Sequence, residues 1–147
     1  MDIWLDTLDT KTIILGSKLG ILTGVTTNPS LIAESGLSLE ENINAILKCQ
    51  SGPLTVQVTA VDHSGIIEQA ETLRDYSERI IIKIPVTQEG LKAMESLSHL
   101  QFPIMATAVF TPFQALFACH AGAAFIAPYF SRIGNPLDAL EGMVLML

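Results

Sequence analysis

One lysine in this sequence lies where it could do covalent chemistry on a carbonyl group. Lys83 interrupts the apolar run Ile-Ile-Ile-Lys-Ile-Pro-Val of residues 80–86, and such a run is typical of a buried parallel strand. Burial penalises an ammonium ion and lowers its pKa, and a partly neutral amine attacks carbonyl carbons to form a Schiff base. Alternatively, the lysine reaches solvent from a strand end or closes a structural ion pair. Lys83 alone leaves both interpretations open.

Polar side chains also lie near or just past the ends of the other apolar runs. Each could be a capping or turn residue, but capping does not explain why every run ends in one. In a (β/α)8 barrel, the residues at the carboxyl ends of the strands build the active site. We therefore expect a shared site formed by six residues: Asp6, Asn28, Gln57, Lys83, Thr107 and Tyr129.

Strands and helices are expected to alternate from one end of the chain to the other. Strand patterns cover residues 1–7, 24–27, 54–60, 80–86, 104–110 and 124–129. Helical patterns begin at Asp9, at Ser38, at Asp62 or Ser64, at Gln88, at Pro112 and at Pro136. Ser38 and Glu41 have the spacing of a capping box. This alternation predicts parallel strand pairing with right-handed crossovers.

Two architectures fit this order, a doubly wound open sheet and a (β/α)8 barrel. No GxGxxG or Walker sequence follows an early strand, which disfavours a nucleotide-binding open sheet. A full barrel takes about 200 residues or more, whereas the chain has 147. We expect an α/β fold of the (β/α)8 TIM-barrel family, incomplete with about six βα units, in a single domain over residues 1–147. Either the chain is a piece of a longer protein, or another chain covers the open edges.

Composition excludes several classes of partner and site. The formal charge of −7 has no offsetting basic cluster, so nucleic acid is not expected to bind. Residues 102–130 are apolar enough to suggest a membrane span, but Pro103, Pro112 and Pro128 favour a buried strand, helix and strand instead. The three histidines lack metal-ligand spacing. Two distant cysteines and the absence of a signal-peptide pattern predict a cytoplasmic location.

Several longer strings then point to one family. They are Leu-Asp-Thr at 5–7, Gly-Val-Thr-Thr-Asn-Pro-Ser at 24–30, Val-Gln-Val at 56–58, Ile-Lys-Ile-Pro-Val-Thr at 82–87, Gly-Leu at 90–91, Thr-Ala-Val-Phe at 107–110 and Ala-Pro-Tyr-Phe-Ser-Arg-Ile at 127–133. With these strings the chain resembles the transaldolases, and most closely the short-chain branch that includes fructose-6-phosphate aldolase. The resemblance extends over residues 1–133 in the same order.

The resemblance implies a role for each strand-end residue. Lys83 would form a Schiff base with the ketone of a sugar phosphate such as fructose 6-phosphate. The C3–C4 bond would then break and leave a dihydroxyacetone enamine, with no metal or other cofactor. The other catalytic residues would be Asp6 for proton transfer and Gln57, Thr107 and Tyr129 around a catalytic water. The substrate-binding residues would be Thr26 and Asn28 for the dihydroxyacetone unit and Arg132 for the phosphate.

Each of these residues also has a structural interpretation. Asp6 could be the counter-ion of Lys83, and Asn28 a turn residue before a proline. The others could be satisfied core polar groups, a core aromatic residue and a surface arginine.

Two side chains favour an aldolase over a transaldolase within this family. Transaldolases usually carry Phe at the position of Tyr129, and the longer ones carry Glu at that of Gln57, whereas the aldolase branch carries the residues found here. A phenol can route a proton to the enamine, which favours release of dihydroxyacetone. The alternatives are a transaldolase that transfers this unit between sugar phosphates, and a weakly active or inactive remnant that oligomerises. The family's seventh and eighth strands are absent, and a homo-oligomer is expected.

Overall fold

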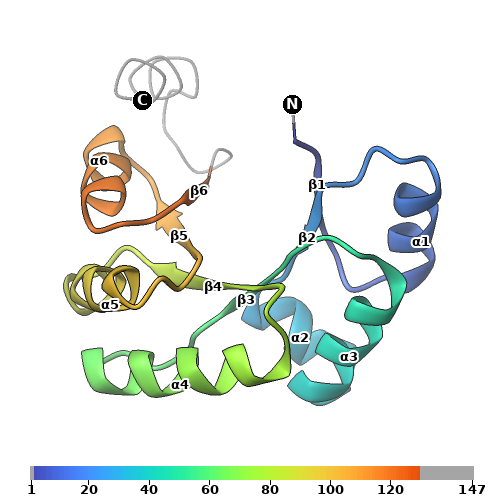
Figure 1. Ribbon diagram of the computed structural model, residues 1–147, viewed down its shortest axis with the longest axis horizontal. Coiled ribbons are helices and arrows are strands. Elements are labelled where there is room, and N and C mark those ends of the chain that lie inside the picture. Colours follow the sequence, from blue (N-terminus) through green and yellow to red (C-terminus); the bar gives the residue numbers. More distant parts are fainter. Residues whose placement is uncertain (1, 130–147) are drawn as a thin grey trace.

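The computed structural model describes residues 2–129 and places six strands in one parallel sheet (Figure 1). The strands are β1 (Trp4–Asp6), β2 (Gly24–Thr26), β3 (Leu54–Gln57), β4 (Ile80–Pro85), β5 (Ile104–Val109) and β6 (Phe125–Pro128). Each strand pairs with the next along the chain, whereas a doubly wound sheet reverses its strand order at a switch point. The order and the curl of the sheet confirm the prediction of an incomplete (β/α)8 barrel.

Helices cover the convex side of this curled sheet (Figure 1). They are α1 (Thr10–Lys18), α2 (Pro29–Ser35), α3 (Leu39–Cys49), α4 (His63–Tyr76), α5 (Gln88–His99) and α6 (Pro112–His120). Among residues 2–129, no helix has the length and apolar character needed to cross a membrane. The apolar segment that begins at residue 102 forms β5, α6 and β6, as predicted up to the last described residue.

Helix starts follow the capping residues identified in the sequence. Asp9 caps α1 by accepting from the backbone amides of Lys11 and Thr12, and the Ser38–Glu41 capping box is formed at the start of α3. Asp62 caps α4. These side chains satisfy amides that the first helical turn leaves unpaired. The helix expected from Pro136 lies outside the described residues.

Helix α2 was not predicted, because Asn28-Pro29 was interpreted as a turn after the second strand. The Asn28 side chain accepts a hydrogen bond from the Leu31 amide at 3.0 Å, and Pro29 takes the first helical position. Asn as a cap followed by Pro is a helix-start signal that the sequence does contain. The helix ends at Gly36, which has a φ of 70°, a conformation that glycine adopts without steric cost.

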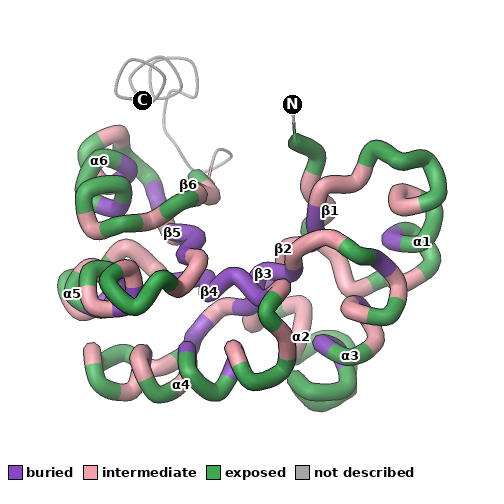
Figure 2. Tube along the Cα trace, in the orientation of Figure 1, coloured by how far each residue is buried: buried purple, intermediate pink, exposed green. Residues whose placement is uncertain are grey.

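The hydrophobic core lies between the convex side of the sheet and the helices. Ile80, Ile82 and Ile84 alternate along β4 and are fully buried there, and α1, α3, α4, α5 and α6 each add buried side chains to the same cluster. Figure 2 shows the buried residues concentrated along the central strands. Each buried isoleucine stabilises the fold by about 1.5–3 kcal/mol relative to an exposed one, so the central strands are firmly held against the helices.

Arg79 fastens the end of α3 to the start of β4. Its guanidinium donates to the carbonyls of Leu47 and Gln50 at 2.7 and 2.6 Å, and to that of Gly52 at 3.3 Å. The last carbonyls of a helix lack intrahelical partners, and a planar fork can bind several of them at once.

We expect Arg79→Ala to lower the free energy of unfolding by about 3 kcal/mol or more, because it removes two short hydrogen bonds from a charged donor and such bonds are worth about 1.5–3 kcal/mol each. Urea unfolding of the purified chain measures this. Arg74→Ala is the matched control, since the Arg74 guanidinium lies 5.5 Å from the Phe102 ring centre and such contacts contribute about 0.5–1 kcal/mol. Equal losses in the two variants would contradict this role for Arg79.

Candidate active site

The pairing register of the sheet decides which side chains share a face with Lys83. Residues paired across parallel strands project to the same side, and successive residues alternate. Lys83 pairs with Gln57 on β3 and with Met105 on β5, opposite to the buried isoleucines of the core. Continuing the register across the sheet gives the polar residues of the concave face: Asp6, Thr26, Thr55, Gln57, Lys83 and Thr107. Four of the six strand-end residues singled out in the sequence are therefore on one face.

Lys83 is held in a buried environment on this face. The residue is 6% exposed, and its Nζ donates to the backbone carbonyl of Thr27 at 2.8 Å. Burial lowers the pKa of the Lys83 amine, and the negative charge of Asp6 opposes that shift in part. A lysine whose pKa is lowered by desolvation has a larger neutral fraction near pH 7, which is what a nucleophile toward carbonyls needs.

Asp6 is oriented by the neighbouring strand. The Thr26 hydroxyl donates to Asp6 Oδ1 at 2.7 Å, between residues that are paired in the register of β1 and β2. Within residues 2–129, Lys83 and Asp6 form no direct ion pair. The Asp6 carboxylate therefore acts on Lys83 through its charge at longer range and does not form a contact ion pair with it.

Three buried polar atoms on the concave face make no hydrogen bond with other described residues: Thr55 Oγ1, Gln57 Oε1 and Thr107 Oγ1. Gln57 and Thr107 come from the two strands that flank the lysine strand. Buried polar atoms in proteins nearly always have a partner. Atoms in this arrangement suit water molecules or substrate hydroxyls bound beside Lys83.

Aromatic side chains lie deeper on the same face, toward the amino ends of the strands. Trp4 of β1 and Phe125 of β6 meet edge to face, with ring centres 5.7 Å apart. Trp4 also covers Gly24, where a Cβ atom would come within 2.5 Å of the indole, so a side chain there would displace it. These rings add apolar surface beneath the polar residues, in keeping with the desolvation of Lys83.

Tyr129 follows β6 and lies outside the regular register. Its ring packs edge to face on Phe110 with ring centres 5.2 Å apart, and its amide donates to the Val109 carbonyl at 2.9 Å. The register of β5 and β6 shifts between Ala106 and Val109, and Ala108 there has a φ of 56°. Bulges of this kind re-aim side chains at the ends of barrel strands.

The other two predicted substrate-binding residues are Asn28 and Arg132. Asn28 is half-buried at the end of β2, and its Oδ1 is engaged in capping α2. This agrees with a structural role at the strand end and leaves the amide Nδ2 as its possible ligand-binding atom. Arg132 lies outside the described residues.

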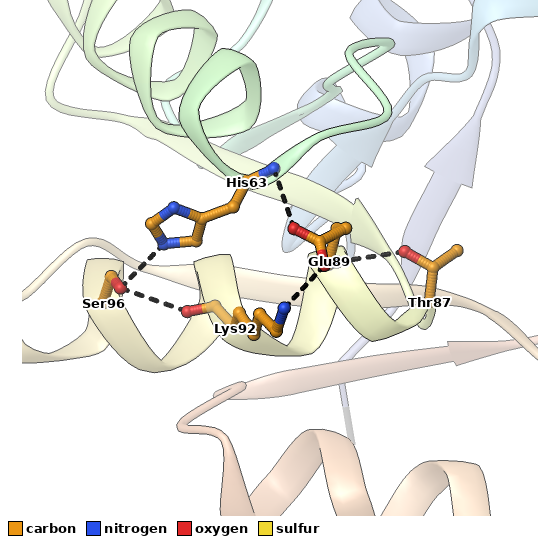
Figure 3. Close-up of polar contacts among 6 residues, drawn as sticks. His63, Thr87, Glu89, Lys92 and Ser96 are labelled. Carbon is orange, nitrogen blue, oxygen red and sulfur yellow. Dashed lines mark hydrogen bonds and ion pairs between the residues drawn. The ribbon is translucent and has the colours of Figure 1, made fainter.

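His63 has a structural role at the start of α4, as Figure 3 shows. Its backbone amide donates to Glu89 Oε2 at 3.3 Å, and its ring Nε2 lies 3.0 Å from Ser96 Oγ. Glu89 also pairs with Lys92 at 2.7 Å. This network joins α4 to α5 on the outside of the barrel. Residues 2–129 contain no group of three or more His, Cys, Asp or Glu side chains placed to hold a metal ion.

A cavity of about 640 Å³ lies mainly on the helix side of β2 and β3. Its lining includes Ile32 of α2 and Gln69 and Leu73 of α4, together with Gln57 at the strand end. Lys83, Asp6 and Thr107 do not line it. The cavity therefore lies mainly outside the concave face and reaches it at Gln57 and Thr27.

Two residues near Lys83 were not assigned a role from the sequence. Thr27 supplies the carbonyl that binds Nζ, and Thr55 places a buried hydroxyl on the concave face. The period-two alternation that places Gln57 on the concave face also places Thr55 there. The Thr27 contact joins residues 56 positions apart in the sequence, and no local pattern marks it.

Comparisons with known proteins agree with this fold. A family model described as transaldolase/fructose-6-phosphate aldolase matches residues 3–143. A "probable transaldolase" of Coprothermobacter proteolyticus is 43% identical over 133 residues, covering 90% of this chain and 61% of that protein. One of Geotalea uraniireducens is 42% identical, covering 92% and 63%. The chain thus spans less than two thirds of the length of these relatives.

Solved structures resemble the chain in fold alone. An inosine 5′-monophosphate dehydrogenase from Legionella pneumophila aligns with a TM-score of 0.60 at 22% identity, covering 87% of this chain and 39% of that one. A mandelate oxidase mutant aligns with a TM-score of 0.63 at 10% identity, covering 99% and 56%. In each case a part of a longer chain matches most of this one.

Proposed function

Because the chain belongs to the transaldolase/fructose-6-phosphate aldolase family, we propose that it carries the Schiff-base site of an aldolase acting on fructose 6-phosphate. Lys83 attacks the C2 ketone, and loss of water gives an iminium ion. The iminium accepts the electrons of the C3–C4 bond, which breaks to release glyceraldehyde 3-phosphate. The remaining enamine is protonated and hydrolysed, which frees dihydroxyacetone and the lysine.

The observation that carries this proposal is the state of Lys83. Its amine is buried on the concave face, its pKa is lowered by that burial, and its hydrogen-bond partner is a neutral carbonyl. A structural lysine at such a position would be expected to pair with a carboxylate. The lowered pKa increases the neutral, nucleophilic fraction of the amine at physiological pH.

Asp6 is proposed as the proton-transfer group. C–C cleavage requires removal of the proton from the C4 hydroxyl, and a carboxylate oriented by Thr26 Oγ1 is suited to accept it. Gln57, Thr107 and Tyr129 are proposed to hold the water that exchanges protons with the enamine. Thr26, Asn28 and Arg132 are proposed to bind the substrate, with Arg132 at the phosphate.

A transaldolase is the second candidate, favoured by the names of the relatives. Both activities pass through the same enamine and differ in its acceptor. Incubation with fructose 6-phosphate, with and without erythrose 4-phosphate, measures dihydroxyacetone released against sugar transferred. Mostly release supports the aldolase, and mostly transfer supports the transaldolase. If neither product forms and no Lys83 adduct is found, the non-catalytic remnant is favoured.

We expect Tyr129→Phe to lower dihydroxyacetone release about tenfold or more while leaving the Lys83 adduct intact, because it removes the phenol that would pass a proton to the enamine. Release is measured enzymatically, and the adduct by mass spectrometry after borohydride reduction. Tyr76→Phe is the control, since Tyr76 is exposed at the end of α4. Unchanged release in Tyr129→Phe would contradict the aldolase assignment.

The partners expected from composition remain predictions. The net charge of −7 disfavours nucleic acid, and sugar phosphates are the proposed substrates. A homo-oligomer and a cytoplasmic location also remain predictions, which light scattering and cell fractionation would test.

A further inference from the structure

The partner of the Lys83 amine is a feature that the proposed reaction does not by itself require. Nζ donates at 2.8 Å to the main-chain carbonyl of Thr27. A carbonyl oxygen only accepts hydrogen bonds, and it can do so from an ammonium ion or from a neutral amine. Unlike a carboxylate, it adds no full negative charge that would hold the proton on the lysine. The contact can therefore persist when Lys83 becomes a nucleophile.

Thr27 is itself held in place by the next strand. Its amide and its hydroxyl both donate to the carbonyl of Thr55, at 3.2 and 2.8 Å, and the residue is 2% exposed. The register of β2 with β3 ends at the pair Thr26 and Thr55, so the Thr27 carbonyl lies past the last registered pair. On the other side, Asn28 caps α2. The peptide that carries this carbonyl is thus fixed from both ends.

We propose that Thr27 is a positioning residue for Lys83: its hydroxyl fixes the peptide whose carbonyl orients the amine toward a bound ketone. This rests on the proposed Schiff-base function. A neutral amine has two N–H donors and one lone pair, so a hydrogen bond to one N–H restricts the directions in which the lone pair can point. Such orientation speeds attack because little motion remains to be lost in reaching the reactive geometry.

The charged groups around Lys83 determine in which direction the pH profile of its reaction should move if the Thr27 carbonyl is displaced. Among the described residues, the charged group that acts on its pKa is Asp6 of β1. The register partners on β3 and β5, Gln57 and Met105, are uncharged. If the carbonyl is displaced, the freed amine can turn toward the Asp6 carboxylate, which favours the protonated form.

Thr27→Val and Thr27→Ser test the proposal by removing or keeping the hydroxyl. We expect the valine variant to form the Lys83 adduct with dihydroxyacetone about tenfold more slowly at pH 7, with its rate profile moved to higher pH. The serine variant should stay within about twofold of the original chain. Adduct formation is followed by mass spectrometry after cyanoborohydride reduction. Thr72→Val is the control, because it removes a hydroxyl–carbonyl hydrogen bond of 2.9 Å at an exposed position on α4, and it should change neither rate nor profile.

These experiments distinguish a failure of the positioning role of Thr27 from a failure of the proposed function. If the original chain forms no adduct on Lys83, the proposed function fails. If the chain reacts and Thr27→Val has the same rate and pH profile, the positioning role is wrong and the function stands. Should Thr27→Val not fold, the carbonyl ¹³C resonance of Thr27 is compared between the original chain and Lys83→Met. A shift on loss of the amine is expected, and an unchanged resonance would overturn the contact.

Discussion

Lys83→Met is expected to abolish cleavage of fructose 6-phosphate, with a loss of at least about a thousandfold, because no other group in the proposed mechanism can form the iminium. Methionine has a similar length, has no charge and suits a buried position. The variant should therefore fold, and its melting temperature should equal or exceed that of the original chain, since the cost of burying an ammonium is removed. Glyceraldehyde 3-phosphate release and thermal unfolding measure the two effects.

Two further variants make this result specific to the amine. Lys83→Arg keeps the positive charge without a usable nucleophile, and it should be as inactive as the methionine variant. Lys11→Met removes an exposed lysine from α1, and it should retain full activity. Residual cleavage in Lys83→Met at the level of the Lys11 control would show that another residue does the chemistry.

Asp6→Asn is expected to lower turnover about a hundredfold or more by removing the group that accepts the C4 hydroxyl proton. The amide can still accept a hydrogen bond from Thr26, which donates at 2.7 Å to Oδ1. The Asp6 charge raises the pKa of Lys83, so its loss should lower that pKa further and enlarge the neutral fraction at pH 7. Schiff-base formation should then be as fast as before or faster, while C–C cleavage slows.

Slower C–C cleavage with unimpaired Schiff-base formation would distinguish a catalytic role of Asp6 from a general loss of structure. Single-turnover experiments with borohydride quenching should show the fructose 6-phosphate adduct accumulating in Asp6→Asn, whereas little accumulates in the original chain. Asp75→Asn, at an exposed position on α4, is the control and should behave like the original chain. Slower adduct formation in Asp6→Asn would instead assign Asp6 to binding or to the fold.

The fold was predictable wherever one local pattern decides the outcome. The apolar run around Lys83 marks β4, and Asp9, Ser38 and Asp62 mark helix starts because a capping side chain acts over three residues. Helix α2 was missed because Asn28-Pro29 suits both a turn and a capped helix. The choice between them depends on how the following residues pack, which the short segment does not reveal.

The residues of the concave face were predictable only in part, where local alternation along a strand determines them. Alternation along β3 and β4 places Gln57 and Lys83 on one side, and pairing across the sheet brings in Asp6 and Thr26. The Thr27 carbonyl could not be foreseen, because main-chain acceptors carry no side-chain signature and the contact spans 56 positions. The capping role of the Asn28 side chain was missed although Asn followed by Pro is a helix-start signal, because the same pair also suits a turn.

The most direct test of the Schiff-base site is the pH dependence of reductive trapping at Lys83. The chain is incubated with dihydroxyacetone and cyanoborohydride from pH 5 to 11, and each lysine-containing peptide is quantified by mass spectrometry. Because burial lowers the Lys83 pKa, we predict an adduct on Lys83 at pH 7 whose formation rate levels off below the ordinary lysine value of about 10.4. Exposed lysines such as Lys11 should react appreciably only near that value. A Lys83 profile that matches the exposed lysines, or an adduct spread evenly over all lysines, would contradict the proposed site.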